Sequence, residues 1–262
     1  MKLPMMRIRL LAALFSGATL AAAAIPGFAQ TDAPIVVLGS VAVRGALDKL
    51  GPMFEKTSGR KVVIQYDSAA ALASRAATGE GYDVVVTSVG AVDGFVKTGA
   101  VAADTEAVVG TAVASLVYKH GTPKPDISSP DALKAVLLAA KSISFSDPAA
   151  GGASSVYFAG VAQRLGISDA VMQKATLTKV GEGAIPVGTG QTQYAVAQSS
   201  EYAVIPGLDG VPIFPADPKS TSKFAAAVST KSAQPDAARA FVIFMRSPDG
   251  TAVRNAMGLG GG

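Results

Sequence analysis

The chain has 262 residues, of which 49% are hydrophobic and 16% are charged, so it can bury a large core as one domain or as two lobes. It has no cysteine and only one histidine, which excludes disulfides, cysteine-ligated zinc and histidine-rich metal centres. We therefore expect no metal site and no other cofactor.

The first thirty residues have the pattern of a secretory signal peptide. Lys2, Arg7 and Arg9 form a basic start, residues 10–24 are apolar, and Gly27 and Ala29 supply the small residues of a cleavage site. We predict a signal peptide at residues 1–29, release into the periplasm and no membrane insertion after cleavage. The alternative, a membrane anchor, is disfavoured because the apolar stretch is shorter than the ~20 residues of a membrane span.

The charge of the exported chain is close to zero. Three of the 23 basic residues lie in the predicted signal peptide, which has no acidic residue, and this leaves about 20 basic residues against 19 acidic ones. Basic runs with interleaved aromatic residues are absent from the sequence. We therefore expect no nucleic-acid partner, and we expect a monomer.

The first part of the exported chain alternates strand-like and helix-like segments. Leu47, Leu50 and Phe54 repeat at helical spacing, although Pro52 predicts a kink or a broken start in that helix. We predict a strand at 35–38 before this helix and a strand at 61–65 after it. A second helix is predicted from 67 to 78, followed by a third strand at 82–87. This β-α-β-α-β order predicts a parallel sheet with a ligand at the carboxyl ends of its strands.

The second part of the chain repeats this alternation. We predict strands at 112–118, 143–146, 202–205 and 224–229. We also predict four helices: one that begins at Asp131, one that ends at Arg164, one that ends at Gln198 and one that spans 236–245. The glycine-rich end, 258–262, is expected to fray. The predicted fold class is α/β, a two-lobed clamp in which each lobe is a mostly parallel sheet flanked by helices. Two crossover strands join the lobes near 114–118 and 224–229. Lobe I is predicted as 30–116 plus 224–262, and lobe II as 117–223.

Short motifs spread over nearly the whole exported chain resemble one family. They are Ala46-Leu47-Asp48, Leu72-Ala73, residues 83–88, residues 115–119, Ser146-Asp147-Pro148, Leu165-Gly166 and Ser247-Pro248. In this order they resemble the ModA-like (molybdate-binding type) periplasmic solute-binding proteins. The resemblance implies a type II periplasmic-binding-protein clamp that holds a small anion between its lobes, and an ABC permease as a partner.

The residues expected to bind molybdate are not all present. The family holds its tetrahedral dianion with hydroxyl groups and backbone amides, but the first two serine positions fall here on Ala42 and Ala69. Ser40 and Ser68 lie close to these positions and are candidate ligands. The loss of two hydroxyl groups would leave anion oxygens without donors, which argues against molybdate.

Other polar residues suit a carboxylate better. Arg44 follows the first strand, Arg75 lies on the second helix, and Ser154 and Ser155 open a helix of the other lobe. Guanidinium groups pair with carboxylates through two hydrogen bonds, and helix N-termini attract anions. The alternatives stay open: both arginines as solvated helix residues, the serines as helix caps, and residues 198–201 as a surface turn.

The Gly-Gly-x-Ser turn at 151–154 and the motif Gln198-x-x-Glu201 resemble a branch of the ModA-like proteins that includes a periplasmic aconitate isomerase. This resemblance implies an allylic 1,3-proton shift between trans- and cis-aconitate, which needs anchored carboxylates and one acid–base group. The candidate catalytic residues are Glu201, Tyr66 and Asp67. The candidate substrate-binding residues are Ser40, Arg44, Ser68, Arg75, Ser154, Ser155 and Gln198.

Two functions therefore remain open from the sequence. One is an isomerase of a small unsaturated polycarboxylate, with aconitate as the specific prediction. The other is the substrate-binding subunit of an ABC importer for molybdate-like oxyanions or organic carboxylates, without catalysis. His120 has a suitable reference pKa for acid–base chemistry, but its Gly-Pro loop predicts a solvated turn residue.

Overall fold

The computed structural model describes residues 33–78 and 81–261. The predicted signal peptide, residues 1–29, lies outside these ranges. None of the helices in the described ranges has the length and apolar character that crossing a membrane requires.

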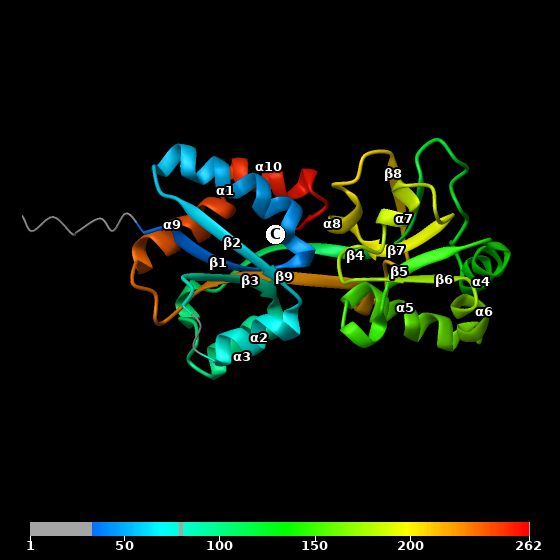
Figure 1. Ribbon diagram of the computed structural model, residues 1–262, viewed down its shortest axis with the longest axis horizontal. Coiled ribbons are helices and arrows are strands. Elements are labelled where there is room, and N and C mark those ends of the chain that lie inside the picture. The colour runs from blue at the N-terminus through cyan, green and yellow to red at the C-terminus, as the bar shows by residue number, and fades with distance from the viewer. Residues whose placement is uncertain (1–32, 79–80, 262) are drawn as a thin grey trace, which may run out of the picture. The chain divides into compact units, whose positions relative to one another are not determined.

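Lobe I is a sheet with helices on both faces (Figure 1). Strand β1 pairs in parallel with β2 and β3, and β9 pairs antiparallel with both β3 and β4. Val37 and Leu38 point to opposite faces of β1 and are both fully buried, as expected for a strand covered on both sides. Helices α1, α9 and α10 pack on one face, and α2 and α3 pack on the other. The elements are β1 (Ile35–Ser40), α1 (Arg44–Ser58), β2 (Val62–Asp67), α2 (Ala69–Ala77), β3 (Val84–Ser88), α3 (Val89–Lys97), β4 (Ala107–Lys119), β9 (Thr221–Val228), α9 (Pro235–Met245) and α10 (Pro248–Ala256).

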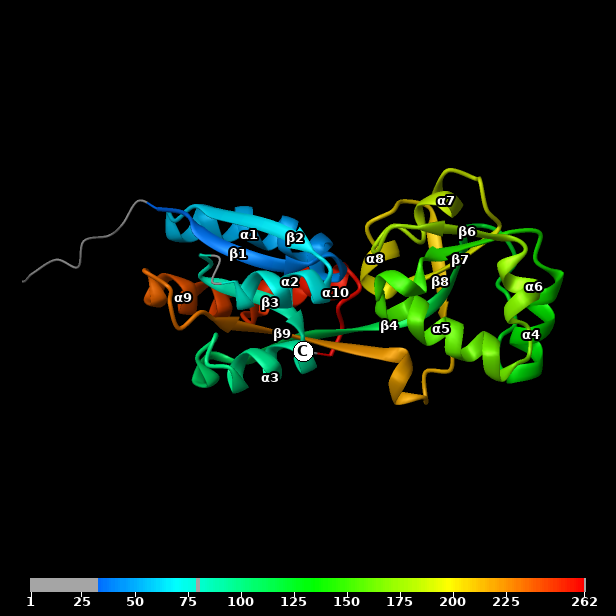
Figure 2. The same cartoon turned by 60° about the horizontal axis from the view of Figure 1, so that its bottom comes forward.

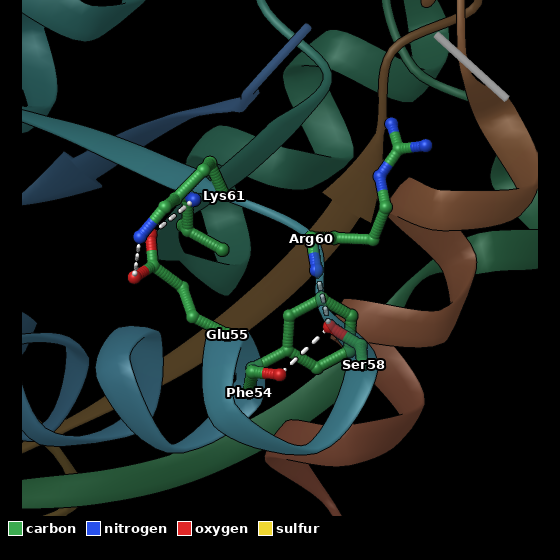
Figure 3. Close-up of polar contacts among 6 residues, drawn as sticks. Phe54, Glu55, Ser58, Arg60 and Lys61 are labelled. Carbon is green, nitrogen blue, oxygen red and sulfur yellow. Dashed lines mark hydrogen bonds and ion pairs between the residues drawn. The ribbon is translucent and has the colours of Figure 1, made fainter. Parts of the chain in front are cut away.

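The turn from α1 into β2 is held by polar contacts (Figure 3). The Glu55 carboxylate accepts a hydrogen bond from the backbone N–H of Val62 at 2.8 Å and pairs with Lys61 at 3.2 Å. The Ser58 hydroxyl donates to the Phe54 carbonyl at 2.7 Å, one turn back along the same helix. Helix α1 begins at Arg44 and continues through Pro52, so the predicted broken start is wrong, whereas a kink at Pro52 stays a prediction.

Lobe II is a second sheet with its own core. Strand β5 pairs in parallel with β6 and β7, and the far half of β4 pairs antiparallel with β7 and β8. Phe145 and Phe158 pack edge to face in the core, with ring centroids 5.2 Å apart. The elements are α4 (Pro130–Ala139), β5 (Ile143–Ser146), α5 (Ala153–Arg164), α6 (Ser168–Met172), β6 (Ala175–Thr178), α7 (Ile185–Gly188), β7 (Tyr194–Gln198), α8 (Ser199–Tyr202) and β8 (Leu208–Pro212).

Strand β4 links the two sheets. Its residues up to Val113 pair with β9, and those from Ala114 onward pair with β7 and β8 (Figure 2). The chain returns from lobe II at Thr221, where β9 begins. By the density of its contacts the chain from Asp32 onward forms one compact unit, so the predicted lobe boundaries stay a prediction.

Two predicted segments differ from the structure. Residues Tyr194–Gln198 were predicted to end a helix, but they form strand β7, and the predicted strand at 202–205 is the end of α8 and a loop. A short apolar run fits either structure, and here pairing with β4 and β5 decides for a strand. The C-terminal residues described by the structure are not frayed, because Leu259 is buried and Gly260 bridges to Thr111.

Candidate functional site

A pocket of about 470 Å³ lies where α1 of lobe I meets α8 and the loop 180–182 of lobe II. Pockets of a few hundred cubic ångströms are large enough for small organic ligands. Basic and acidic side chains share its wall, together with backbone and small apolar groups. The charged residues that line it are Arg44, Asp48, Lys49, Glu182 and Glu201.

Glu201 is a half-buried acid at this pocket. It is the third residue of the single-turn helix α8, and its Oε2 accepts a hydrogen bond from the backbone N–H of Gln198 at 2.9 Å. Oε1 has no hydrogen-bond partner among the described residues and is not fully buried. Burial raises the pKa of Glu201 to about 7, while the Gln198 hydrogen bond opposes the rise. A carboxyl with this pKa can both accept and return a proton at neutral pH.

Gln198 and Ser200 are two further buried polar residues of this turn. The side-chain Nε2 of Gln198 donates to the Ser222 hydroxyl at 2.9 Å, and the side chains of Gln198 and Glu201 form a capping box, in which each faces the backbone N–H of the other residue. Gln198 does not line the pocket, whereas Ser200 does, and the buried Ser200 hydroxyl has no partner among the described residues. Buried polar groups normally have partners, so the Ser200 hydroxyl is a place that water or a ligand can complete. Sequence reasoning missed Ser200, although it lies inside the Gln198–Glu201 motif.

Arg44 begins α1 and is held by an aromatic ring. Its guanidinium carbon lies 4.7 Å from the centre of the Tyr66 ring, in cation–π geometry. The Tyr66 hydroxyl donates to Asp48 Oδ1 at 2.6 Å. Burial, and then the neighbouring Asp48, raise the pKa of Tyr66, so its hydroxyl stays protonated. Asp48 was not predicted as a site residue, although it lies four residues after Arg44 on the same helix face.

The other two lobe I candidates near β1 and β2 cap helical turns. The Ser40 hydroxyl accepts from the backbone N–H of Ala42 at 3.4 Å, and the Ser68 hydroxyl accepts from that of Ala71 at 3.2 Å. Neither serine lines the pocket. Both stand at the carboxyl ends of strands, directly before helical segments, as the sequence led us to expect.

Asp67 and Arg75 contact each other. The carboxylate of Asp67 accepts from its neighbour's backbone N–H at 2.8 Å and lies 4.0 Å from the Arg75 guanidinium. Arg75 also donates to the side-chain oxygen of Gln65. These contacts tie α2 to the edge strand β2, and neither residue lines the pocket.

Ser154 and Ser155 lie in the first turn of α5 and are both buried. The Ser155 hydroxyl donates back to the Gly152 carbonyl at 2.9 Å. Helix α5 has no side-chain cap at Gly152, so its first N–H groups remain available as donors. The two serines do not line the pocket that contains Glu201.

His120 and Asp147, which were both named from the sequence, have structural contacts. His120 is exposed and pairs with Asp209 at 2.9 Å, beside the edge of lobe II. Asp147 accepts from the backbone N–H of Ala149 at 2.9 Å and so caps a short helical turn. Within the described ranges, no cluster of three or more histidine, aspartate or glutamate side chains could hold a metal ion.

Comparison with known proteins places the chain in a family. Residues 35–260 match the family described as bacterial extracellular solute-binding protein. The chain is 31% identical over 237 residues to an aconitate isomerase from a Pseudomonas species, covering 88% of this chain and 89% of that protein.

Solved structures share the fold. The molybdate-binding protein of Azotobacter vinelandii is 20% identical, with a TM-score of 0.64 over 86% of this chain and 98% of that one. The sulfate-binding protein of Mycobacterium tuberculosis is also 20% identical, with a TM-score of 0.63 over 86% of each chain. The predicted type II clamp and the resemblance to the ModA-like proteins are confirmed, and the isomerase supports the predicted branch. The chain belongs to the family of bacterial extracellular solute-binding proteins.

Proposed function

We propose that this protein is a periplasmic isomerase that converts trans-aconitate to cis-aconitate in the pocket between its lobes. One observation carries the proposal: a half-buried carboxyl with a pKa of about 7, Glu201, lines the same pocket as Arg44. The similarity to an aconitate isomerase along most of both chains supports the choice of substrate.

The proposed reaction is a proton shift catalysed by Glu201. Its ionised carboxyl removes a proton from the methylene carbon of the substrate, and the electron pair of that C–H bond moves into a new double bond. The former double bond opens toward its far carbon, which takes the proton back from Glu201. Nothing is oxidised or reduced, and the base is regenerated, so one acid–base group is sufficient.

The other residues would bind and orient. Arg44 would pair with a substrate carboxylate through two hydrogen bonds, held in place by the Tyr66 ring and Asp48. The Tyr66 hydroxyl stays protonated and donates a hydrogen bond to Asp48, and the Asp67 carboxylate lies beside the Arg75 guanidinium. Both residues therefore suit a supporting role better than the role of the base. Gln198, which holds the Glu201 turn through the capping box, stays a proposed ligand but does not line this pocket. The remaining proposed ligands lie outside this pocket. They are Ser40, Ser68, Ser154 and Ser155, at strand ends and helix starts, and Arg75, in the last turn of α2.

A second function stays under consideration because of the family. Members described as solute-binding proteins need no acid–base group, and the fold alone does not imply catalysis. Under this proposal the protein delivers an oxyanion or an organic carboxylate to an ABC permease. Such a protein would bind its ligand tightly and release it unchanged.

Incubation with trans-aconitate separates the two proposals. We expect proton NMR to show cis-aconitate forming between pH 5 and pH 9, and Glu201→Gln to abolish its formation. Glu106→Gln, a half-buried glutamate outside the pocket, is the matched control and should remain active. Absence of turnover over this pH range, with tight binding of an unchanged anion by calorimetry, would favour the importer subunit.

Arg44→Ala tests the proposed anchor under either function. Loss of a charge-assisted hydrogen-bond pair costs about 1.5–3 kcal/mol, so affinity for a carboxylate should fall about 10- to 100-fold. Lys56→Ala, an exposed cation in the last turn of the same helix, should leave affinity unchanged. Equal affinities for Arg44→Ala and the parent protein would show that the anchor lies elsewhere.

A further inference from the structure

The helix that presents Glu201 is too short to be stable by itself. Helix α8 has four residues, which is a single turn. Isolated helices need more than about 12 residues to persist in water. The Gln198 backbone N–H holds the Glu201 carboxylate within the turn, so the position of the carboxyl depends on what holds the whole turn in place from outside.

Ser199, the first residue of α8, connects the turn to two other segments. Its hydroxyl donates to the Gly258 carbonyl at 2.7 Å and accepts from the backbone N–H of Val113 at 3.0 Å. Val113 is the last residue of β4 that pairs with β9 before the strand enters lobe II. One side chain thus ties α8 to the crossover strand and to the C-terminal segment.

The C-terminal segment is itself fixed. Gly260 accepts hydrogen bonds from the backbone N–H of Thr111 at 2.7 Å and from its hydroxyl at 2.8 Å. Leu259 is buried in the core of lobe I. These contacts anchor residues 259 and 260 on lobe I, while Gly258, the residue before them, contacts Ser199 of α8 in lobe II.

Only glycine fits at position 258. Its φ is +73°, and an added Cβ would lie 2.4 Å from the Ser199 carbonyl oxygen and 2.6 Å from the Ser199 carbonyl carbon. Backbone thus packs directly on backbone at this point. The adjacent Met257 lines the pocket with Glu201, so the contact also closes one wall of the site.

We propose that the C-terminal segment 258–260 is a strap, and that Ser199 is a positioning residue through which the strap holds Glu201 in its shielded place. The inference rests on the proposed function in that Glu201 is taken as the acid–base group. The strap itself can be tested without turnover. The charged groups that share the pocket with Glu201 are Arg44, Asp48 and Lys49 on α1 and Glu182 on the facing loop, and the strap variants leave all of them in place.

The test is an NMR titration of the Glu201 carboxyl in protein labelled with ¹³C at the glutamate carboxyl carbon, with Glu201→Gln to assign the signal. The variants are Ser199→Ala and Gly258→Ala. The control is Gly207→Ala, which has a similar φ of +78° but no atom within 4 Å of the added Cβ. A loosened turn admits water, so the titration midpoint should fall by at least one pH unit in both variants and stay unchanged in the control.

Unchanged midpoints in both variants would overturn the strap. If Gly258→Ala does not fold, Ser199→Ala decides, because it removes two hydrogen bonds and adds no bulk. If turnover is present, kcat should fall at least tenfold with little change in KM, and the acid limb of the rate profile should move with the titration. If the parent protein shows no turnover, the proposed isomerase fails, and the titration still decides whether the strap positions Glu201.

Discussion

Replacing Glu201 with glutamine should stabilise the protein at alkaline pH while removing the proposed chemistry. Glutamine has the same shape, and its side-chain oxygen can still accept the hydrogen bond that Glu201 takes from the Gln198 backbone. What the change removes is the ionisable group. A gain in stability together with a loss of activity is typical of substitutions at residues that serve catalysis at a cost to stability.

The size and sign of the effect follow from the raised pKa. A rise from 4.5 to about 7 corresponds to roughly 3 kcal/mol between the protonated and ionised forms. Because the folded state binds this proton more tightly than the unfolded state, its contribution is fully present below pH 4.5 and is lost as the pH rises through 7. The parent protein should therefore lose up to about 3 kcal/mol of unfolding free energy between pH 5 and pH 8 that Glu201→Gln does not lose.

Urea unfolding followed by circular dichroism at pH 5, 6, 7 and 8 measures this difference. Glu106→Gln again serves as the control, since it alters a half-buried glutamate outside the pocket. The variant and the parent should be similar at pH 5, and the difference between them should grow from pH 5 to pH 7 and level off by pH 8. A difference in unfolding free energy that is independent of pH would refute the argument, because it would mean that Glu201 is as well solvated when folded as when unfolded.

Two substitutions at the wall of the pocket test the geometry around Arg44. Tyr66→Phe keeps the ring under Arg44 but removes the hydrogen bond to Asp48. We expect kcat/KM to fall about three- to tenfold and the free energy of unfolding to fall by about 1 kcal/mol. Unchanged steady-state kinetics would show that this hydrogen bond does not orient the arginine. Gly45→Ala places a Cβ 2.3 Å from Cγ1 of Val204, which lines the pocket in the loop after α8, so the Val204 side chain must shift. We expect weaker ligand binding by calorimetry, and an affinity equal to that of the parent would mean that Val204 shifts without consequence for the pocket.

Much of the fold was predictable because short apolar runs and turn residues indicate where strands and helices begin and end. The strand at 143–146 was predicted with its observed bounds, since a short apolar run there is flanked by polar and turn residues. The second helix, predicted from 67 to 78, differs from the observed Ala69–Ala77 only at its ends. Strand β7 was predicted wrongly, because Tyr194–Gln198 is apolar enough for either a helix or a strand and only its neighbours in the sheet decide.

The candidate site was predictable in part. Arg44 was predicted from its place after a strand and Glu201 from the motif that begins at Gln198, and the structure brings them to one pocket although they are far apart in the chain. Asp48 and Ser200 were not predicted, because a position one helical turn after Arg44 and a position inside the Gln198–Glu201 motif are equally typical of a solvated helix residue and a turn residue. Ser154 and Arg75 were predicted as ligands, and they lie outside this pocket.

The amino-acid sequence by itself determined the α/β alternation, the ModA-like family and the residue types available for anion binding. These follow from hydrophobic periodicity, turn residues and motif order, all of which act over short stretches of chain. Only the tertiary structure decided that Glu201 is desolvated, that Tyr66 holds Arg44, and that Gly258 meets Ser199. Desolvation and close backbone contact arise between segments separated by tens to hundreds of residues, and a local pattern does not contain that information.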